Sequence, residues 1–285
     1  MKAWKGCDAM LGDVLVSGGG KLRVLSPGMD AVRREATLES CGAVCVSGGT
    51  VFAAGESEGV IYRLDRSLLP NGVYAGGPGM RGLCVSGDDA RLYVLLGDAD
   101  SVMMLSAADG TPRFLARTGA NPQRMRLAEK EGAIIIAGGM DAGALMLCGE
   151  TLSVLACFRE EGFCCDAVLH CGTLYMLCLT DSMETRLVMC FADGSRRRIH
   201  LPGIPGSLYA SGSRLMAAAG ACLYVFDVRS MDLIWKRSLE GLCGKLIRGG
   251  KGLMLLDPSY GMLAQIASCG MRILGRNIKD AAAWG

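Results

Sequence analysis

The 285-residue sequence predicts an all-β fold built from one repeated four-stranded unit. Apolar runs of strand length close on glycine-rich turns, and one strand–turn–strand pattern recurs along the whole chain. The chain is 51% apolar and only 20% charged, an excess expected when strands are buried on both faces. Sustained helical periodicity is missing, which disfavours a parallel α/β fold. We therefore predict a seven-bladed β-propeller with four antiparallel strands per blade.

The central strand pair of the repeat recurs seven times. In each copy an apolar run ends in glycine or small residues, a tight turn follows, and a second apolar run ends near Asp, Ser or Cys. The copies span residues 13–28, 50–67, 89–111, 133–150, 173–195, 214–230 and 252–268. The apolar residues that close the second runs recur about every 40 residues, the period of a propeller blade. They are Leu25, Leu64, Leu105, Leu147, Cys190, Phe226 and Ile266.

Each central pair is preceded and followed by a further strand, such as AVCVSGG at 43–49 and PRFLARTG at 112–119. Basic residues occur in six of the seven following strands, and we expect these strands to be outer edges protected by charge. The alternative is a basic surface for an acidic partner, best supported by the run 196–198, which is three arginines. The blades of this single domain are predicted at 1–40, 41–79, 80–122, 123–162, 163–203, 204–241 and 242–279, with a tail at 280–285.

The two ends of the chain are expected to meet at the seam between the first and last blades. The last blade is predicted to hold four strands of its own. KAWKG at 2–6 and AAAWG at 281–285 would then clasp across the seam, with Trp4 against Trp284.

The charge and the apolar stretches of the sequence indicate which kinds of partner and compartment to expect. Thirty basic against 28 acidic residues give a net charge of +2, which does not indicate a nucleic acid or an anionic membrane. The long uncharged stretch from Leu215 to Phe226 is too short to span a bilayer as a helix. The N-terminus lacks a continuous apolar stretch of signal-peptide length, and the 14 cysteines lie mostly inside apolar strands. We expect a reducing, cytoplasmic location.

Two units carry matching motifs: Gly119, Asn121 and Pro122 before a first strand, Leu92, Tyr93 and Val94 in a second strand, and Asp109 and Gly110 after a third. Through these residues the two units resemble the YVTN-type β-propeller repeat found in lactonase-like propellers. The segment CLYVFDVRSMDLIWKRSL is also similar to a quinoprotein-type propeller repeat through Tyr224, Asp227 and Trp235. The resemblance implies a propeller, a fold that hosts both enzymes and binding proteins.

Two short motifs match known functional sequence patterns but lack the flanking secondary structure that those patterns require. Residues 55–59 satisfy G-x-S-x-G, but both flanks read as strands, whereas a nucleophile elbow needs a strand-to-helix turn. Residues 77–82 satisfy G-x-G-x-x-G, but a hairpin follows where a dinucleotide fingerprint needs a helix. The cysteines lack zinc-site spacing. We predict no catalytic residue, no metal and no cofactor.

Charged and polar residues at the start of several first strands are the candidate ligand-binding residues. At these positions other blades have Val, Leu or Cys, and a charge there requires water or a partner. Cys164 and Cys165 begin one such strand as a vicinal pair, for which buried packing is the favoured interpretation and redox or metal chemistry the alternative. The candidates at this channel mouth are Arg81, Gln123, Arg124, Asp166, Lys245, Cys164 and Cys165.

Three functions fit these observations. The first is a non-catalytic scaffold that binds another protein through a propeller face or rim. The second, implied by the YVTN resemblance, is a lactonase-like enzyme acting at the channel mouth, in which Arg81, Arg124 and Asp166 handle an anionic substrate. Gln123 stands where that family often has histidine, and the chain has only two histidines. The third is quinone-dependent redox chemistry at Cys164 and Cys165.

Overall fold

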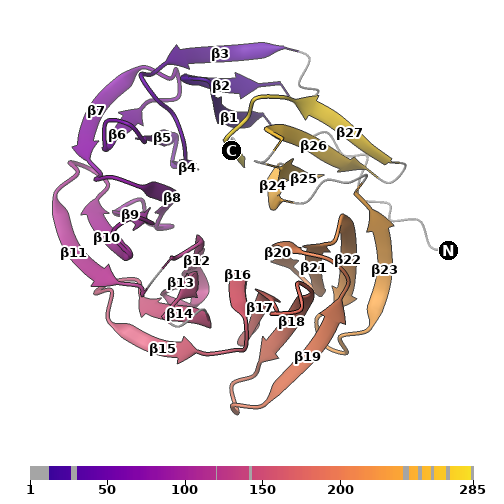
Figure 1. Cartoon of the computed structure of the whole chain (residues 1–285). Coiled ribbons are helices and arrows are strands. Elements are labelled where there is room, and N and C mark those ends of the chain that lie inside the picture. Colours follow the sequence, from indigo (N-terminus) through magenta and orange to yellow (C-terminus); the bar gives the residue numbers. More distant parts are fainter. Residues whose placement is uncertain are drawn as a thin grey trace. The chain divides into compact units, whose positions relative to one another are not determined.

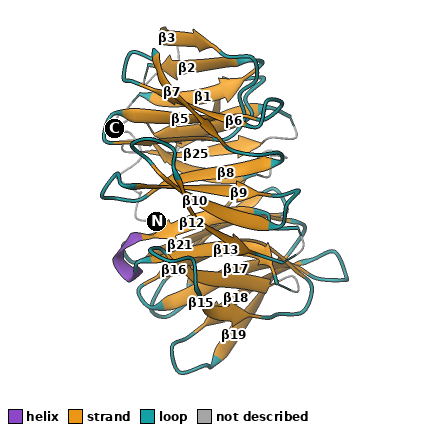
Figure 2. Ribbon diagram, turned by 90° about the vertical axis from the view of Figure 1, so that its left-hand side faces the viewer, coloured by secondary structure: helices purple, strands orange, loops and turns teal. Residues whose placement is uncertain are grey.

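The computed structural model describes residues 13–26, 31–119, 121–140, 143–239, 244–249, 252–257, 260–267 and 270–283. They form seven sheets of four antiparallel strands, the blades of a β-propeller (Figures 1 and 2). The single helical segment in this part of the chain is a 3-10 turn, η1, at Glu129–Glu131. The predicted fold class is therefore confirmed.

The chain groups into two compact units. Unit 1 comprises residues 1–99, 103–113 and 246–285, and unit 2 comprises residues 100–102 and 114–245. The organisation as a single domain stays a prediction. The first strand of each sheet is called its inner strand below, and the fourth its outer strand.

Unit 1 holds three complete sheets. The first has the order β28-β1-β2-β3, the second β4-β5-β6-β7 and the seventh β24-β25-β26-β27, while the residues of the third, β8 to β11, are divided between the units. The strands are β1 Val14–Gly18, β2 Lys21–Leu25, β3 Val32–Thr37, β4 Val44–Ser47, β5 Thr50–Gly55, β6 Val60–Leu64, β7 Pro70–Ala75, β8 Met80–Val85, β9 Arg91–Leu96, β10 Ser101–Ser106, β11 Pro112–Arg117, β24 Lys245–Gly249, β25 Gly252–Asp257, β26 Met262–Ala267, β27 Gly270–Gly275 and β28 Asp280–Ala283.

Unit 2 holds the fourth, fifth and sixth sheets, each in simple chain order. Figure 1 shows its inner strands β12, β16 and β20 gathered along one edge of the unit, with the outer strands β15, β19 and β23 along the opposite edge. The strands are β12 Arg124–Ala128, β13 Ala133–Gly139, β14 Gly143–Cys148, β15 Val154–Phe158, β16 Phe163–His170, β17 Thr173–Leu179, β18 Thr185–Cys190, β19 Arg196–Leu201, β20 Pro205–Ser211, β21 Arg214–Ala219, β22 Cys222–Asp227 and β23 Leu233–Ser238.

The residues that close the third strands occupy an equivalent position in sheet after sheet. All seven are buried, and each of the six whose pairing is described lies opposite an apolar residue of the second strand. These pairs are Val14–Leu25, Val51–Leu64, Ile134–Leu147, Leu174–Cys190, Leu215–Phe226 and Leu253–Ile266. The repeat found in the sequence is therefore the repeat of the structure.

Neighbouring sheets within a unit share apolar cores. In unit 2 one cluster joins the fourth and fifth sheets and another joins the fifth and sixth. In unit 1 separate clusters join the seventh sheet to the first, the first to the second, and the second to the third. The central strands therefore pack on both faces, which accounts for the apolar excess of the composition.

The C-terminal strand β28 supplies the inner strand of the first sheet. It runs antiparallel to β1, with Val14 opposite Ala283 and Ser17 opposite Asp280. Asp280 also accepts a hydrogen bond from the backbone N–H of Val44 at 3.1 Å, which ties β28 to the second sheet. Residues 280–285 are predicted from the sequence as a tail beyond the last blade, because the four-residue strand Asp-Ala-Ala-Ala has no alternating pattern of its own. Trp4 and Trp284, the predicted clasp, lie outside the described residues.

Candidate functional site

A β-bulge at the start of β16 directs Asp166 towards the sixth sheet. Cys164 pairs with Cys178 and Asp166 pairs with Leu177, so Cys165 is an extra residue in the ladder. Adjacent residues of β17 point to opposite faces, and accordingly Cys178 faces the fourth sheet and Leu177 the sixth. Without the bulge, Cys164 and Asp166 would share one face. The extra residue therefore sends the carboxylate to the side where β20 lies.

The side chain of Asp166 is fully buried and joins three inner strands of unit 2. Both of its oxygens are saturated by five hydrogen bonds from β12, β16 and β20. The donors are Arg126 Nε at 2.9 Å, Arg126 Nη2 at 2.6 Å, Arg124 Nη1 at 3.0 Å, and the backbone N–H groups of Leu208 at 2.8 Å and Ala167 at 3.0 Å. Arg126 Nη2 also donates to the Leu208 carbonyl at 2.8 Å, so its guanidinium bridges all three strands.

The side chain of Asp166 carries its charge at neutral pH in the folded protein. Burial by itself would raise the pKa of this carboxyl, but the charges of Arg126 and Arg124 and the hydrogen bonds hold it well below its ordinary value. A carboxylate with no vacant acceptor position and a depressed pKa is a poor general acid or base at neutral pH. Its evident role is to fasten three blades together at their inner edge.

The other predicted residues are placed differently. Gln123 turns its side-chain amide to Asn121, at 2.8 Å from the Asn121 side-chain oxygen. Arg81 lies on β8 in unit 1, with Nη2 3.9 Å from the Asp98 carboxylate. Lys245 is the first residue of β24 and is partly exposed. Arg124 and Asp166 are thus the pair in direct contact, and ligand binding at all of these residues stays a prediction.

The vicinal cysteines do not form a joint site. The Cys164 thiol lies in the core shared with the fourth sheet and points to the Asp166 carbonyl, whereas that of Cys165 points to the Phe163 carbonyl. Hydrogen bonding to Cys178 and burial raise the pKa of the Cys164 thiol. Burial raises the pKa of Cys165 to about 11. Both thiols are therefore protonated at neutral pH, a state that suits packing better than nucleophilic or metal chemistry.

Arg126 was absent from the predicted set although it makes the strongest contact with Asp166. The signal available was the sequence Arg-Met-Arg at 124–126, because alternate residues of a strand share a face. Among the described residues, no group of three or more His, Cys, Asp or Glu side chains could hold a metal ion. Residues 56–59 form the turn between β5, which ends at Gly55, and β6, as the strand-flanked interpretation of G-x-S-x-G predicted.

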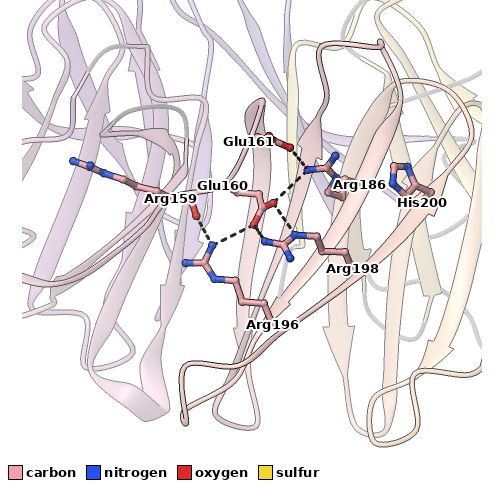
Figure 3. Close-up of a pocket in the computed structure, with 7 residues that line it drawn as sticks. All are labelled: Arg159, Glu160, Glu161, Arg186, Arg196, Arg198 and His200. Atoms are coloured by element: carbon pink, nitrogen blue, oxygen red, sulfur yellow. Dashed lines mark hydrogen bonds and ion pairs between the residues drawn. The ribbon is translucent and has the colours of Figure 1, made fainter.

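A second charged cluster lies at the outer edge of unit 2, in an open depression of about 780 Å³ (Figure 3). Period-two alternation puts Arg196, Arg198 and His200 on one face of β19, and Arg186 of β18 lies directly opposite His200. Glu160, in the connection from β15 to β16, reaches into this face. We call these residues, together with Arg159 and Glu161, the Glu160 cluster.

Glu160 is the anchor of this cluster, with a side chain only 3% exposed. Arg198 binds it through two nitrogens, Nε at 2.9 Å and Nη2 at 3.0 Å. Arg196 Nη1 lies at 3.2 Å and Arg186 Nη1 at 3.4 Å from its oxygens. Burial opposes ionisation, but these three guanidiniums together lower the pKa of Glu160. One carboxylate thus gathers three guanidiniums from the neighbouring strands β18 and β19.

Comparisons with known proteins identify a fold and no family. No family model matches the chain, and no curated protein matches it in sequence. In the part of the chain that the structure describes, no helix is long and apolar enough to cross a membrane.

Several solved structures share the architecture. A functionally unknown protein from Desulfotomaculum acetoxidans is 11% identical over 95% of this chain and 97% of its own, with a TM-score of 0.72. Hydrazine synthase from Kuenenia stuttgartiensis is 13% identical over 80% and 76%, with a TM-score of 0.68. BamB from Moraxella catarrhalis is 14% identical over 94% and 83%, with a TM-score of 0.61. At these identities the likeness concerns the fold alone, and that fold is a propeller.

Proposed function

We propose that this propeller is a non-catalytic binding protein that holds another protein on the outer strands of its blades. The observation that carries the proposal is three pairs of consecutive large apolar residues exposed on outer strands, with the two side chains of each pair on opposite faces of the strand. They are Phe114 and Leu115 on β11, Val154 and Leu155 on β15, and Leu233 and Ile234 on β23. Apolar side chains exposed on an outer strand offer apolar contacts to a protein that lies along that strand.

The inner edge of unit 2 supports a binding role over a catalytic one. Its buried carboxylate, Asp166, already accepts hydrogen bonds from two arginines and two backbone N–H groups. The Gln123 amide is occupied by Asn121. The pKa values of Cys164 and Cys165 are raised, not lowered as a nucleophile requires. The likeness to hydrazine synthase carries no residue over, because a shared fold does not imply a shared site.

Two further assignments belong to the proposal. The YVTN-type repeat is proposed on the residues that carry the resemblance, 92–94, 109–110 and 119–122. A cytoplasmic location is proposed on the cysteines: Cys164 and Cys178 lie directly opposite each other on neighbouring strands, yet both are free thiols. Free thiols on opposite strands suit a reducing compartment.

The experiment that tests the function places a photo-reactive phenylalanine analogue at Leu115 or Leu155 in the full-length protein and cross-links in cells. Met183 is the matched control, because its side chain is as exposed as that of Leu115 (64% against 68%) but lies in a turn. We expect one discrete protein adduct from Leu115 and Leu155 and none from Met183. Identical adducts from all three positions, or none from any, would contradict the proposal.

A thermal-shift panel tests the enzyme alternative. The ligands are sugar lactones, phosphorylated sugars, quinones and divalent metals, each of which raises Tm if it binds only the folded state. We expect no ligand to raise the Tm. A shift that Arg81→Ala or Gln123→Ala abolishes would replace the scaffold with a small-ligand site at the channel mouth.

A further inference from the structure

The outer strand β19 differs chemically from the other outer strands of unit 2. Strands β11, β15 and β23 expose adjacent apolar residues, whereas β19 opens with Arg196, Arg197 and Arg198, all exposed. Arg197 points to the opposite face, where its Nη1 donates to the Ser230 carbonyl at 3.0 Å. One face of β19 is therefore a row of cations above the Glu160 depression (Figure 3).

The charge of this depression is not balanced by its own residues. Three guanidiniums, those of Arg186, Arg196 and Arg198, and two glutamates face it, whereas the Arg159 side chain points away and only its carbonyl meets Arg196 (Figure 3). One of the glutamates, Glu160, is already buried beneath the three guanidiniums. The other, Glu161, is 85% exposed and pairs with Arg186 Nη1 at 3.1 Å. The surface that a ligand meets is thus positive, with one exposed carboxylate already occupying an arginine.

Arg186 has an unused hydrogen-bonding edge. Arg126 and Arg198 each bind a carboxylate through the Nε and Nη2 nitrogens, the geometry that suits a planar anion. Both hydrogen bonds of Arg186 come from Nη1, and its Nε is a buried donor with no acceptor among the described residues. The Nε is buried and therefore out of reach of a ligand. The side chain as a whole is 16% exposed, and a carboxylate in the depression would meet that exposed part of Arg186.

We infer that the Glu160 depression binds an extended acidic segment of a partner protein, whose carboxylates pair with Arg186, Arg196 and Arg198. The inference deepens the proposed function and rests on it, since the ligand is part of a bound protein. Arg196 and Arg198 are two residues apart on a strand, about 7 Å, which is the spacing of alternate side chains in an extended peptide. Glu161 already shows that an exposed side-chain carboxylate reaches Arg186.

The test measures binding of a fluorescent peptide of alternating Glu and Ser to the full-length protein by anisotropy, with a Gln–Ser peptide as the uncharged control. Arg196→Gln removes a guanidinium of the depression and is expected to weaken binding about tenfold, the loss of one charge-assisted hydrogen bond. Arg197→Gln is the matched control: it makes the same charge change one residue away on the opposite face, and we expect less than a twofold effect.

Glu161→Gln provides a gain-of-affinity test that leaves the buried Glu160 contacts in place. Because it removes the exposed carboxylate that competes for Arg186, we expect the Glu–Ser peptide to bind several-fold more tightly. Equal losses in Arg196→Gln and Arg197→Gln would indicate unspecific attraction and overturn the inference. The inference would also be overturned if inorganic phosphate bound, with a loss in Arg196→Gln and none in Arg197→Gln, while the Glu–Ser peptide did not bind.

The two proposals fail separately. Cross-links from Leu115 and Leu155 together with absent peptide binding would overturn the acidic-segment inference and leave the outer-strand scaffold standing. Peptide binding that follows the variant pattern, without those cross-links, would overturn the apolar outer-strand surface and keep the acidic site.

Discussion

At the scale of single residues, Asp166 is the buried charge around which the inner strands of unit 2 are joined. A fully buried carboxylate is stable only when its charge is compensated, and here two guanidiniums and two N–H groups of unit 2 supply that compensation. The result is a buried ion cluster at one of the residues that the sequence marked as a ligand-binding candidate, and ligand binding there stays a prediction. The same residue types in a pattern can therefore serve either role, and only the partners of the carboxylate tell them apart.

Replacing Asp166 by Asn should destabilise the protein by about 3 kcal/mol, because it leaves two partly buried arginines without their counter-charge. The measurement is the urea midpoint of unfolding at neutral pH. Asp98→Asn is the control: this carboxylate is exposed and 3.9 Å from Arg81, so the change should stay within about 0.5 kcal/mol. Similar midpoints for the two variants would show that the cluster is not structural.

The depressed pKa of Asp166 also predicts how stability changes with pH. Above about pH 4 the carboxyl is ionised in both the folded and the unfolded chain, and its contribution is fully present. Below that pH the unfolded chain takes up the proton first, so the contribution is lost as pH falls towards the folded pKa. Tm of the wild type should therefore drop more steeply between pH 4 and pH 2 than Tm of Asp166→Asn. Parallel curves would contradict this.

The raised pKa values of the vicinal cysteines predict slow thiol chemistry. With iodoacetamide at pH 8, the exposed Cys157 and Cys171 should be labelled in the folded protein, whereas Cys164 and Cys165 should be labelled only after denaturation. Mass spectrometry of peptides reports each site. Rapid labelling of Cys165 in the folded state would revive the redox hypothesis.

At the scale of elements, the first sheet depends on strand β28, which comes from the other end of the chain. Ser17 accepts a hydrogen bond from the Asp280 N–H at 3.1 Å and donates one to the Gly42 carbonyl at 2.6 Å. Lys279 Nζ lies 3.1 Å from Glu56. These contacts join β28 to β1 and to the second sheet. A strand with so little sequence signal is positioned by its partners.

Deleting residues 280–285 should lower the stability of the protein by several kcal/mol, since it removes the ladder to β1 and leaves backbone groups of Val14–Gly18 without partners. The measurement is the urea midpoint against the full chain. Deleting only residues 284–285 keeps β28 and serves as the control. A wild-type midpoint after the longer deletion would show that β28 is dispensable. A large loss from the shorter deletion would favour the predicted Trp284 clasp.

At the scale of the whole molecule, the repeat could be predicted from the sequence because its signals lie within short stretches of the chain. Alternating burial, glycine turns and a period near 40 residues lie within neighbouring stretches of chain, and the buried column from Leu25 to Ile266 confirms them. The candidate residues Arg124 and Asp166 were also found, because a charged residue at a position that is apolar in other repeats can be recognised in the sequence. The contacts of the Asp166 carboxylate could not be predicted from the sequence, because they involve Arg126 and Leu208 in other strands.

The sequence by itself thus determined the all-β class, the seven repeats and the strands that are buried. The tertiary structure decided the position of β28, the saturation of Asp166 and the gathering of three arginines on Glu160. Each of these joins residues that are far apart along the chain: Ser17 and Asp280 are 263 positions apart, Arg124 and Asp166 are 42, and Glu160 and Arg198 are 38. A local pattern cannot register such pairs, because only the pairing of distant strands and the packing of neighbouring blades bring them together.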